Sequence, residues 1–171
     1  MIGYPIIFNE LSQGVAVRER ILPDAVTFDD DVRADFNHNP DRILGRCAAG
    51  TLKLSIDAKG VRMEATPPDV AWANDLLVSI RRGDIDQGSF AFCVLPGGQT
   101  FTEENGEQVR NLTKILVHRV SVVSDPAYTN TSIEVRNGAG RGVVPPAPLA
   151  PRAQSAPPEL LRRKQNLAEL V

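Results

Sequence analysis

Apolar and polar residues alternate along much of this chain, and this alternation constrains the fold more than any other feature of the sequence. Leu52, Leu54 and Ile56 would share one face of an extended segment, because successive side chains of a strand point to opposite faces. Residues 57–60 are typical of a turn, and the alternation resumes after them. We therefore predict a β-hairpin with one buried face over residues 51–65.

One helix is expected to follow this hairpin. Pro67-Pro68-Asp69 is a favourable helix start, apolar residues then recur at helical spacing, and Gly83 is a favoured residue just after a helix. These signals predict an amphipathic helix over residues 69–82.

More strands are expected after the helix. A strand is predicted over residues 89–95, and turns at 96–98 and 104–106 separate it from further extended segments. The strongest alternation runs over 110–123, with Leu116, His118, Val120 and Val122 on one face. The chain is thus predicted to be mainly β, mostly antiparallel, with one or two helices, and closure into a small barrel fits this order of elements.

Residues 137–171 differ in composition from the rest of the chain. They hold six of the 13 prolines, and five Lys and Arg against two Asp and Glu, whereas residues 1–136 hold 14 against 19. Proline interrupts both strand ladders and helix interiors, so we predict a Pro/Ala-rich flexible linker over 137–158. For residues 159–171 we predict a short amphipathic helix that orders on a partner. The alternative for this segment is an unstructured, solubilising end.

The composition argues against several classes of function. The net charge is -2, and no basic cluster is interleaved with aromatic residues, so nucleic acid is not an expected partner. No apolar run is long enough to span a bilayer, so no membrane association is expected. Cys47 and Cys93 are far apart and fit no zinc-ligand spacing with the two histidines. We expect no metal and no cofactor, a reducing intracellular setting, and two thiols that act as small buried hydrophobic groups.

His38 and Ser89 are the residues that point to chemistry. A serine hydroxyl is a weak nucleophile until a positioned base takes its proton, and a histidine is the usual base. Ser89 begins the predicted strand 89–95 and shares a face with Ala91 and Cys93, which are small enough to leave room for a substrate carbonyl. Taken singly, Ser89 would more simply be a strand-edge serine, and His38 would more simply be a turn histidine.

Several segments then resemble, in collinear order, the prohead serine proteases of tailed bacteriophages. They are GYPIIFN at 3–9, RILPDAV at 20–26, NHN at 37–39, ILGR at 43–46, GTL at 50–52, GSFAF at 88–92 and VSVVSDPAY at 120–128. The resemblance implies a small antiparallel β-barrel of the herpesvirus assemblin type over residues 1–136. It also implies a serine endopeptidase with Ser89 as nucleophile and His38 as general base.

The third member of the catalytic group is where this chain departs from the family. The family usually carries an Asp or Glu directly before the Val-Ser-Val-Val segment, and that position is Arg119, which cannot accept the histidine proton. Herpesvirus relatives use a second histidine, so His118 is the substitute candidate. Residues 118 and 119 face opposite sides of a regular strand, so His118 would need a bulge or a changed register. The alternative is a histidine packed along Leu116 and Val120.

Other residues are candidates for supporting roles. Asp35, Asp41 and Asp125 are fallback partners for the histidine. Arg119 and Arg110 are candidates to support the oxyanion, although exposed solubilising arginines are the simpler interpretation. Backbone amides near the nucleophile are the expected oxyanion donors.

The resemblance also implies partners and a location. The expected partners are the major capsid protein and its scaffolding segment, with a homo-oligomer as a further possibility, and the expected location is the immature capsid in the host cytoplasm. Residues 159–171 look similar to the start of phage scaffolding helices, so we expect this tail to dock the protease into the assembling shell. The alternative function is a non-enzymatic or impaired assembly factor on the same fold, because Arg119 stands in place of an acid.

Overall fold

The computed structural model describes residues 1–13 and 17–135, and in these residues the chain is mainly β, as predicted. The elements are β1 (Ile2–Ile7), β2 (Arg18–Ile21), β3 (Val26–Phe36), β4 (Asn39–Arg46), β5 (Leu52–Ile56), β6 (Gly60–Ala65), α1 (Ala71–Arg82), β7 (Gln87–Val94), β8 (Gln99–Glu104), β9 (Glu107–Leu112), β10 (Ile115–Val123) and β11 (Ser132–Glu134). The predicted linker 137–158 and tail helix 159–171 lie outside the described residues.

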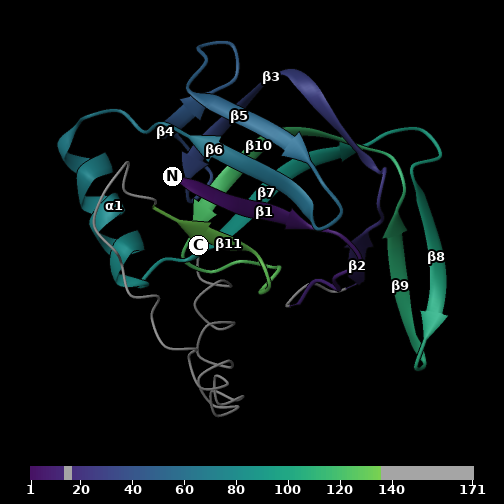
Figure 1. Ribbon diagram of the computed structural model, residues 1–171. Coiled ribbons are helices and arrows are strands. Elements are labelled where there is room, and N and C mark those ends of the chain that lie inside the picture. Colours follow the sequence, from purple (N-terminus) through teal and green to yellow (C-terminus); the bar gives the residue numbers. More distant parts are fainter. Residues whose placement is uncertain (14–16, 136–171) are drawn as a thin grey trace, which may run out of the picture. The chain divides into compact units, whose positions relative to one another are not determined.

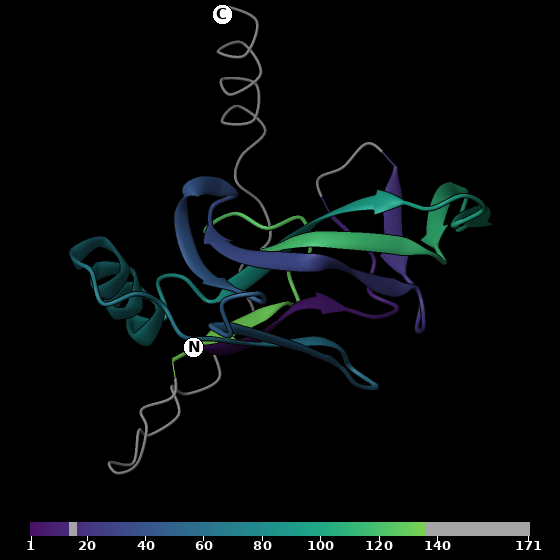
Figure 2. The same ribbon diagram turned by 90° about the horizontal axis from the view of Figure 1, so that it is seen from above.

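The strands form three sheets. Their orders are β11-β1-β6-β5, β4-β3-β10-β7 and β2-β9-β8. The first two sheets lie one above the other, and the third extends to one side with the β8–β9 hairpin (Figures 1 and 2). Most pairs are antiparallel, but β3 pairs with β10, and β2 with β9, in parallel. The sheets are therefore mixed, and the pairings among the described strands do not close into a ring, so the predicted barrel remains a prediction.

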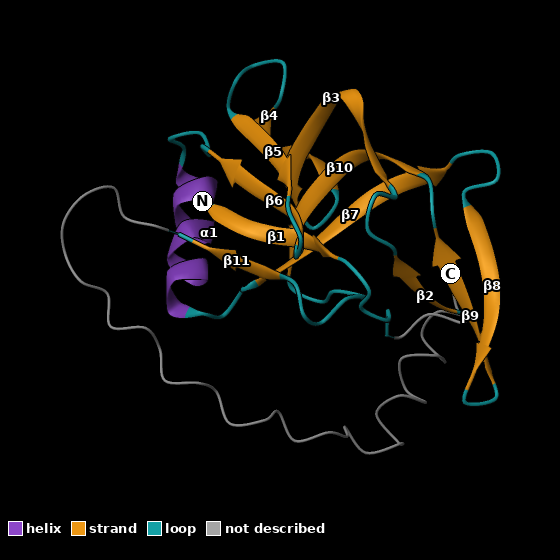
Figure 3. Cartoon of the chain, turned by 45° about the vertical axis from the view of Figure 1, so that its right-hand side comes forward, coloured by secondary structure: helices purple, strands orange, loops and turns teal. Residues whose placement is uncertain are grey.

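The hairpin and the helix occur where their sequence signals lie. β5 and β6 pair antiparallel, with Leu52 opposite Ala65. The helix begins at Ala71 rather than at residue 69, because Val70 is still extended. It ends at Arg82 and is capped by Gly83, whose φ of 80° suits glycine and whose backbone N–H donates to Ile80 O. Figure 3 shows this helix beside β11 and the start of β1.

The predicted strand 110–123 is two strands. The chain turns after Leu112, where the backbone N–H groups of Thr113 and Lys114 donate to Gly98 O at 2.8 and 3.2 Å. This turn places β9 in the three-stranded sheet and β10 in the centre of the β4-β3-β10-β7 sheet. Alternation alone cannot reveal the break, because apolar residues continue on both sides of it.

A bulge in β10 changes which side chains face the core. The register shifts between Val117 and Arg119 against both neighbouring strands. Val117 is fully buried before the shift, and Val120 and Val122 are fully buried after it. The predicted face of Leu116, His118, Val120 and Val122 is therefore wrong in its first half, because the extra residue reverses the alternation.

Candidate active site

Ser89 lies in β7, directly opposite Ser121 of β10. At the preceding residue, Gly88, β7 passes close to β1: a Cβ there would lie 2.8 Å from Pro5 Cα. The Gly88 backbone N–H also donates to the buried hydroxyl of Thr131 at 3.0 Å, and that hydroxyl donates back to Gly88 O at 2.9 Å. These contacts on both sides hold the backbone that presents Ser89.

His38 lies in the tight turn between β3 and β4. Asn37 and His38 have φ of 53° and 55°, so both central residues of the turn are left-handed, as in the type I′ hairpin turn that matches strand twist. The turn is tied to the end of β10, since Asn37 N–H donates to Val122 O at 2.8 Å and Ser124 N–H donates to Asn37 Oδ1 at 3.1 Å. The imidazole is therefore held above the face of β10 and β7.

The two predicted residues meet in the structure. His38 Nε2 lies 3.0 Å from Ser89 Oγ, which is hydrogen-bonding distance across 51 residues of sequence. His38 Nδ1 lies 3.0 Å from the hydroxyl of Ser121, which is fully buried. A hydroxyl and an imidazole in this contact can transfer the serine proton during attack on a carbonyl.

A buried carboxylate lies behind Ser121. The Ser121 hydroxyl donates to Asp35 Oδ1 at 2.6 Å, and Asp35 has no exposed surface. Arg119 Nη1 is 3.2 Å from Asp35 Oδ2 and also donates to His38 O at 3.4 Å. Burial raises the pKa of Asp35, while the Ser121 hydrogen bond and the Arg119 charge act in the opposite direction. The sequence indicates Asp35 only as a fallback partner, and no local pattern in it singles out Ser121.

His118, the other predicted candidate, is placed elsewhere. It is the residue skipped by the register shift in β10, so the bulge that a catalytic role would require is present. Its ion-pair contact, however, is with Asp29, at 3.9 Å from Nδ1. Among the hydrogen bonds and ion pairs of the described residues, none joins His118 to His38 or Ser89. It lines a cavity of about 440 Å³ with Asp29, Ala91 and Arg119.

The other candidates lie away from this contact. Asp41 and Asp125 are exposed. Arg110 donates to Glu19 Oε2 at 3.1 Å and to Gln99 Oε1 at 2.8 Å, so it is engaged in the β2-β9-β8 sheet. The prediction that both thiols are buried is wrong for Cys93, which is exposed, whereas Cys47 is partly buried.

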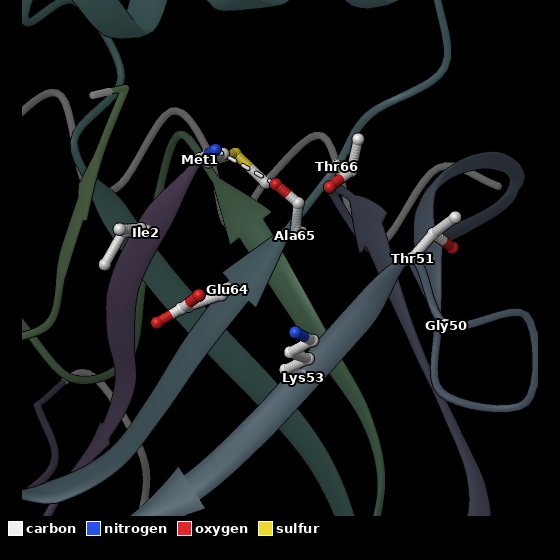
Figure 4. Close-up of a pocket in the computed structure, with 8 residues that line it drawn as sticks. All are labelled: Met1, Ile2, Gly50, Thr51, Lys53, Glu64, Ala65 and Thr66. Atoms are coloured by element: carbon white, nitrogen blue, oxygen red, sulfur yellow. Dashed lines mark hydrogen bonds between the residues drawn. The ribbon is translucent and has the colours of Figure 1, made fainter. Parts of the chain in front are cut away.

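The described residues also contain a second pocket, but no metal-binding group and no membrane-spanning helix. A pocket of about 220 Å³ lies near the Met1 amino group, which donates to Ala65 O at 2.9 Å, and neither Ser89 nor His38 lines it (Figure 4). Within residues 1–13 and 17–135, no three His, Cys, Asp or Glu side chains are grouped to hold a metal ion. In the same residues, no helix has the length and apolar character needed to cross a bilayer.

A serine hydroxyl in contact with an imidazole that is itself held by a second partner is the arrangement found in serine hydrolases. Comparison with known families is consistent with this class. The family model described as caudovirus prohead serine protease matches residues 1–141, and the chain belongs to that family. It is thus a member of the serine proteases of bacteriophage capsid maturation. The comparisons with curated proteins and with solved structures each found no match.

Proposed function

We propose that this chain is a serine endopeptidase that cleaves capsid or scaffold proteins during prohead maturation, with Ser89 as nucleophile and His38 as general base. The observation that carries the proposal is the 3.0 Å contact between Ser89 Oγ and His38 Nε2. It supports a catalytic pair because it joins a hydroxyl to the nitrogen that would take its proton.

The reaction would proceed in two steps. His38 Nε2 takes the hydroxyl proton as Ser89 Oγ attacks the scissile carbonyl, and the imidazolium then gives that proton to the leaving amine. Water, deprotonated by His38, hydrolyses the acyl-enzyme and releases Ser89. The nucleophile and base are thereby both regenerated.

Backbone amides near Ser89 would hold the oxyanion. The N–H of Gly88 is already bonded to Thr131, so other amides must supply the donors. Arg119 is engaged with Asp35 and with His38 O, and Arg110 with Glu19. These contacts occupy Nη1 of Arg119 and Nη1 of Arg110, so backbone amides remain the proposed oxyanion donors.

The partners follow from the family. The expected substrates are the major capsid protein and its scaffolding segment, and the expected place of action is the immature capsid in the host cytoplasm. The same proposal includes a barrel of the assemblin type, assembly into a homo-oligomer, and docking through residues 159–171. Deleting residues 155–171 tests the docking role: loss of co-assembly with retained peptide hydrolysis supports it, and loss of hydrolysis with normal co-assembly contradicts it.

A fluorophosphonate probe tests the active site directly. We expect the probe to label the intact chain and to leave Ser89→Ala unlabelled, with His38→Ala slowed by about 100-fold or more. Ser55→Ala is the matched control, because Ser55 is an exposed serine of β5, which belongs to a different sheet from β7 and β10. Labelling that survives Ser89→Ala would exclude Ser89 as the nucleophile.

The second candidate function is a non-enzymatic assembly factor. The observation that favours it is Arg119, which occupies the position where the family usually carries an acid. This alternative predicts normal co-assembly with capsid protein, no probe labelling, and no effect of Ser89→Ala on assembly.

A further inference from the structure

The hydrogen bonds behind His38 have a direction that depends on the charge of Asp35. A serine hydroxyl has one hydrogen to donate, and an ionised carboxylate can only accept. The Ser121 hydroxyl directs its hydrogen to Asp35 Oδ1, at 2.6 Å. Toward His38 Nδ1, at 3.0 Å, the same oxygen can therefore only accept. Nδ1 must carry the hydrogen when Asp35 is ionised.

This direction decides the protonation state of the nitrogen that faces Ser89. A neutral imidazole has one N–H, so a hydrogen on Nδ1 leaves Nε2 with a free lone pair. Nε2 lies 3.0 Å from Ser89 Oγ, and the Ser89 hydroxyl must then donate to it. That is the arrangement a general base requires.

A protonated Asp35 would reverse the chain of donors. Its O–H could donate to Ser121 Oγ, the Ser121 hydroxyl would then donate to Nδ1, and Nε2 would carry the hydrogen. In that state His38 cannot take the Ser89 proton. The charge on Asp35 thus selects between a base and an inactive tautomer.

Arg119 is positioned to maintain that charge. Its Nη1 lies 3.2 Å from Asp35 Oδ2, an oxygen that is fully buried and has no aligned hydrogen bond of its own. An unpaired buried carboxylate would favour protonation, and a guanidinium at this distance favours the ionised form. The charged groups facing Asp35 are Arg119 from β10 and His38 from the β3–β4 turn.

We propose that Ser121 and Asp35 are the positioning residues that hold His38 in the Nδ1–H tautomer, and that Arg119 keeps Asp35 ionised. This inference rests on the proposed function, since it assigns the groups that orient its base. It also gives a physical reason for an arginine at position 119, where the family usually carries an acid. The negative charge is supplied by Asp35 of β3 through the Ser121 hydroxyl, and Arg119 serves as its counter-ion.

The test reads the tautomer of His38 without relying on proteolysis. The chain has two histidines, so the full-length protein labelled with ¹⁵N-histidine gives two imidazoles, and His118→Asn assigns them. At a pH where the rings are neutral, we expect His38 of the unmodified chain to carry its hydrogen on Nδ1. His118 serves as the internal reference for the Asp35 and Ser121 variants, because its ion-pair contact is with Asp29.

Asp35→Asn is the sharpest variant. Arg119 will attract the carboxamide oxygen, which leaves the NH₂ group toward Ser121 and reverses the chain of donors. We expect the His38 hydrogen to move to Nε2 and the rate of fluorophosphonate labelling of Ser89 to fall by about 100-fold or more. Ser121→Ala should abolish the tautomer preference and slow labelling to a similar extent.

The outcomes separate this inference from the proposed function. A folded Asp35→Asn or Ser121→Ala that keeps the Nδ1–H tautomer and labels within about 3-fold of the unmodified chain overturns the role of the pair while leaving the protease intact. The expected tautomers in a chain that cleaves no capsid protein would uphold the pair and reject the proposed substrate.

A second pair of variants applies if either buried variant fails to fold. Arg119→Gln removes the charge that faces Asp35, and Arg119→Lys retains it. A shift of the His38 hydrogen toward Nε2 in the glutamine variant alone supports the inference, and equal behaviour of the two variants overturns it.

Discussion

Ser89 and Ser121 are directly opposed across the β7–β10 pair, and the imidazole of His38 bridges their hydroxyls, with one ring nitrogen 3.0 Å from each. Opposed residues of an antiparallel pair lie on the same face, which brings the two hydroxyls close enough for one ring to reach both. The β3–β4 turn then needs only to place the ring above this pair. The site is thus built from one cross-strand pair and one turn.

Arg119→Gln should shift the acid limb of Ser89 labelling to higher pH. The ionised form of Asp35 is the one that supports the base, so labelling falls as the pH falls through the pKa of Asp35. Burial already raises that pKa above its ordinary value of 3.8, and the Arg119 charge opposes the rise. Removing the charge therefore raises the pKa further and moves the limb upward. Labelling rates measured across pH check this, with Arg119→Lys as the control, and an unmoved limb in the glutamine variant contradicts it.

Asn37 should stabilise the fold in two separable ways, through its side-chain hydrogen bond and through its left-handed backbone conformation. Asn37→Gly keeps the left-handed backbone at φ 53° but loses the hydrogen bond from Ser124 N–H. We expect it to lower the free energy of unfolding by about 1 kcal/mol. Asn37→Ala also places an unsuited residue in that conformation and should cost about 1–2 kcal/mol more. Denaturant unfolding measures both, and equal stability of the two variants would contradict a role for the backbone conformation.

Gly88→Ala should destabilise the chain and disturb Ser89 together. The added Cβ would lie 2.8 Å from Pro5 Cα and 3.0 Å from Pro5 Cβ, so β1 or β7 must shift. Overpacking of this kind typically costs about 1–3 kcal/mol. Gly106→Ala is the comparison variant, because it lies at the tip of the β8–β9 hairpin and its Cβ would meet nothing within 4 Å, so its φ of 79° costs stability without a clash near Ser89. We expect slowed probe labelling only for Gly88→Ala, and unchanged labelling in a folded Gly88→Ala would show that the close approach does not position Ser89.

His118→Asn should leave the chemistry largely intact. His118 contacts Asp29 at 3.9 Å, and Ser121 occupies the position beside His38 Nδ1. We expect probe labelling within about 3-fold of the unmodified chain, against a loss of about 100-fold or more for His38→Ala. If a folded His118→Asn is labelled as slowly as His38→Ala, then His118 takes part in catalysis, and the assignment of Ser121 as the partner of His38 is contradicted.

Local patterns in the sequence predicted the elements that depend on near neighbours. Alternation predicted the β5–β6 hairpin, and helical spacing with Gly83 predicted α1 to within two residues at its start. The same patterns missed the break after Leu112 and the bulge in β10, because both arise from contacts with other strands. The mixed, partly parallel pairing was also missed, since alternation does not report strand direction.

The candidate site shows the same contrast between what local patterns predict and what contacts between strands decide. His38 and Ser89 were singled out by several segments that resemble the prohead proteases in collinear order, because residue type alone would leave a turn histidine and one serine among several. Which groups stand behind His38 depended on strand register and on the bulge at residues 117–119, neither of which a local pattern encodes. By itself the sequence determined the mainly β character and supplied the two residues for which the chemistry is proposed. Only the tertiary structure decided that Ser121, with Asp35 behind it, lies beside the imidazole in place of His118, since that choice is made by contacts between residues more than 80 positions apart.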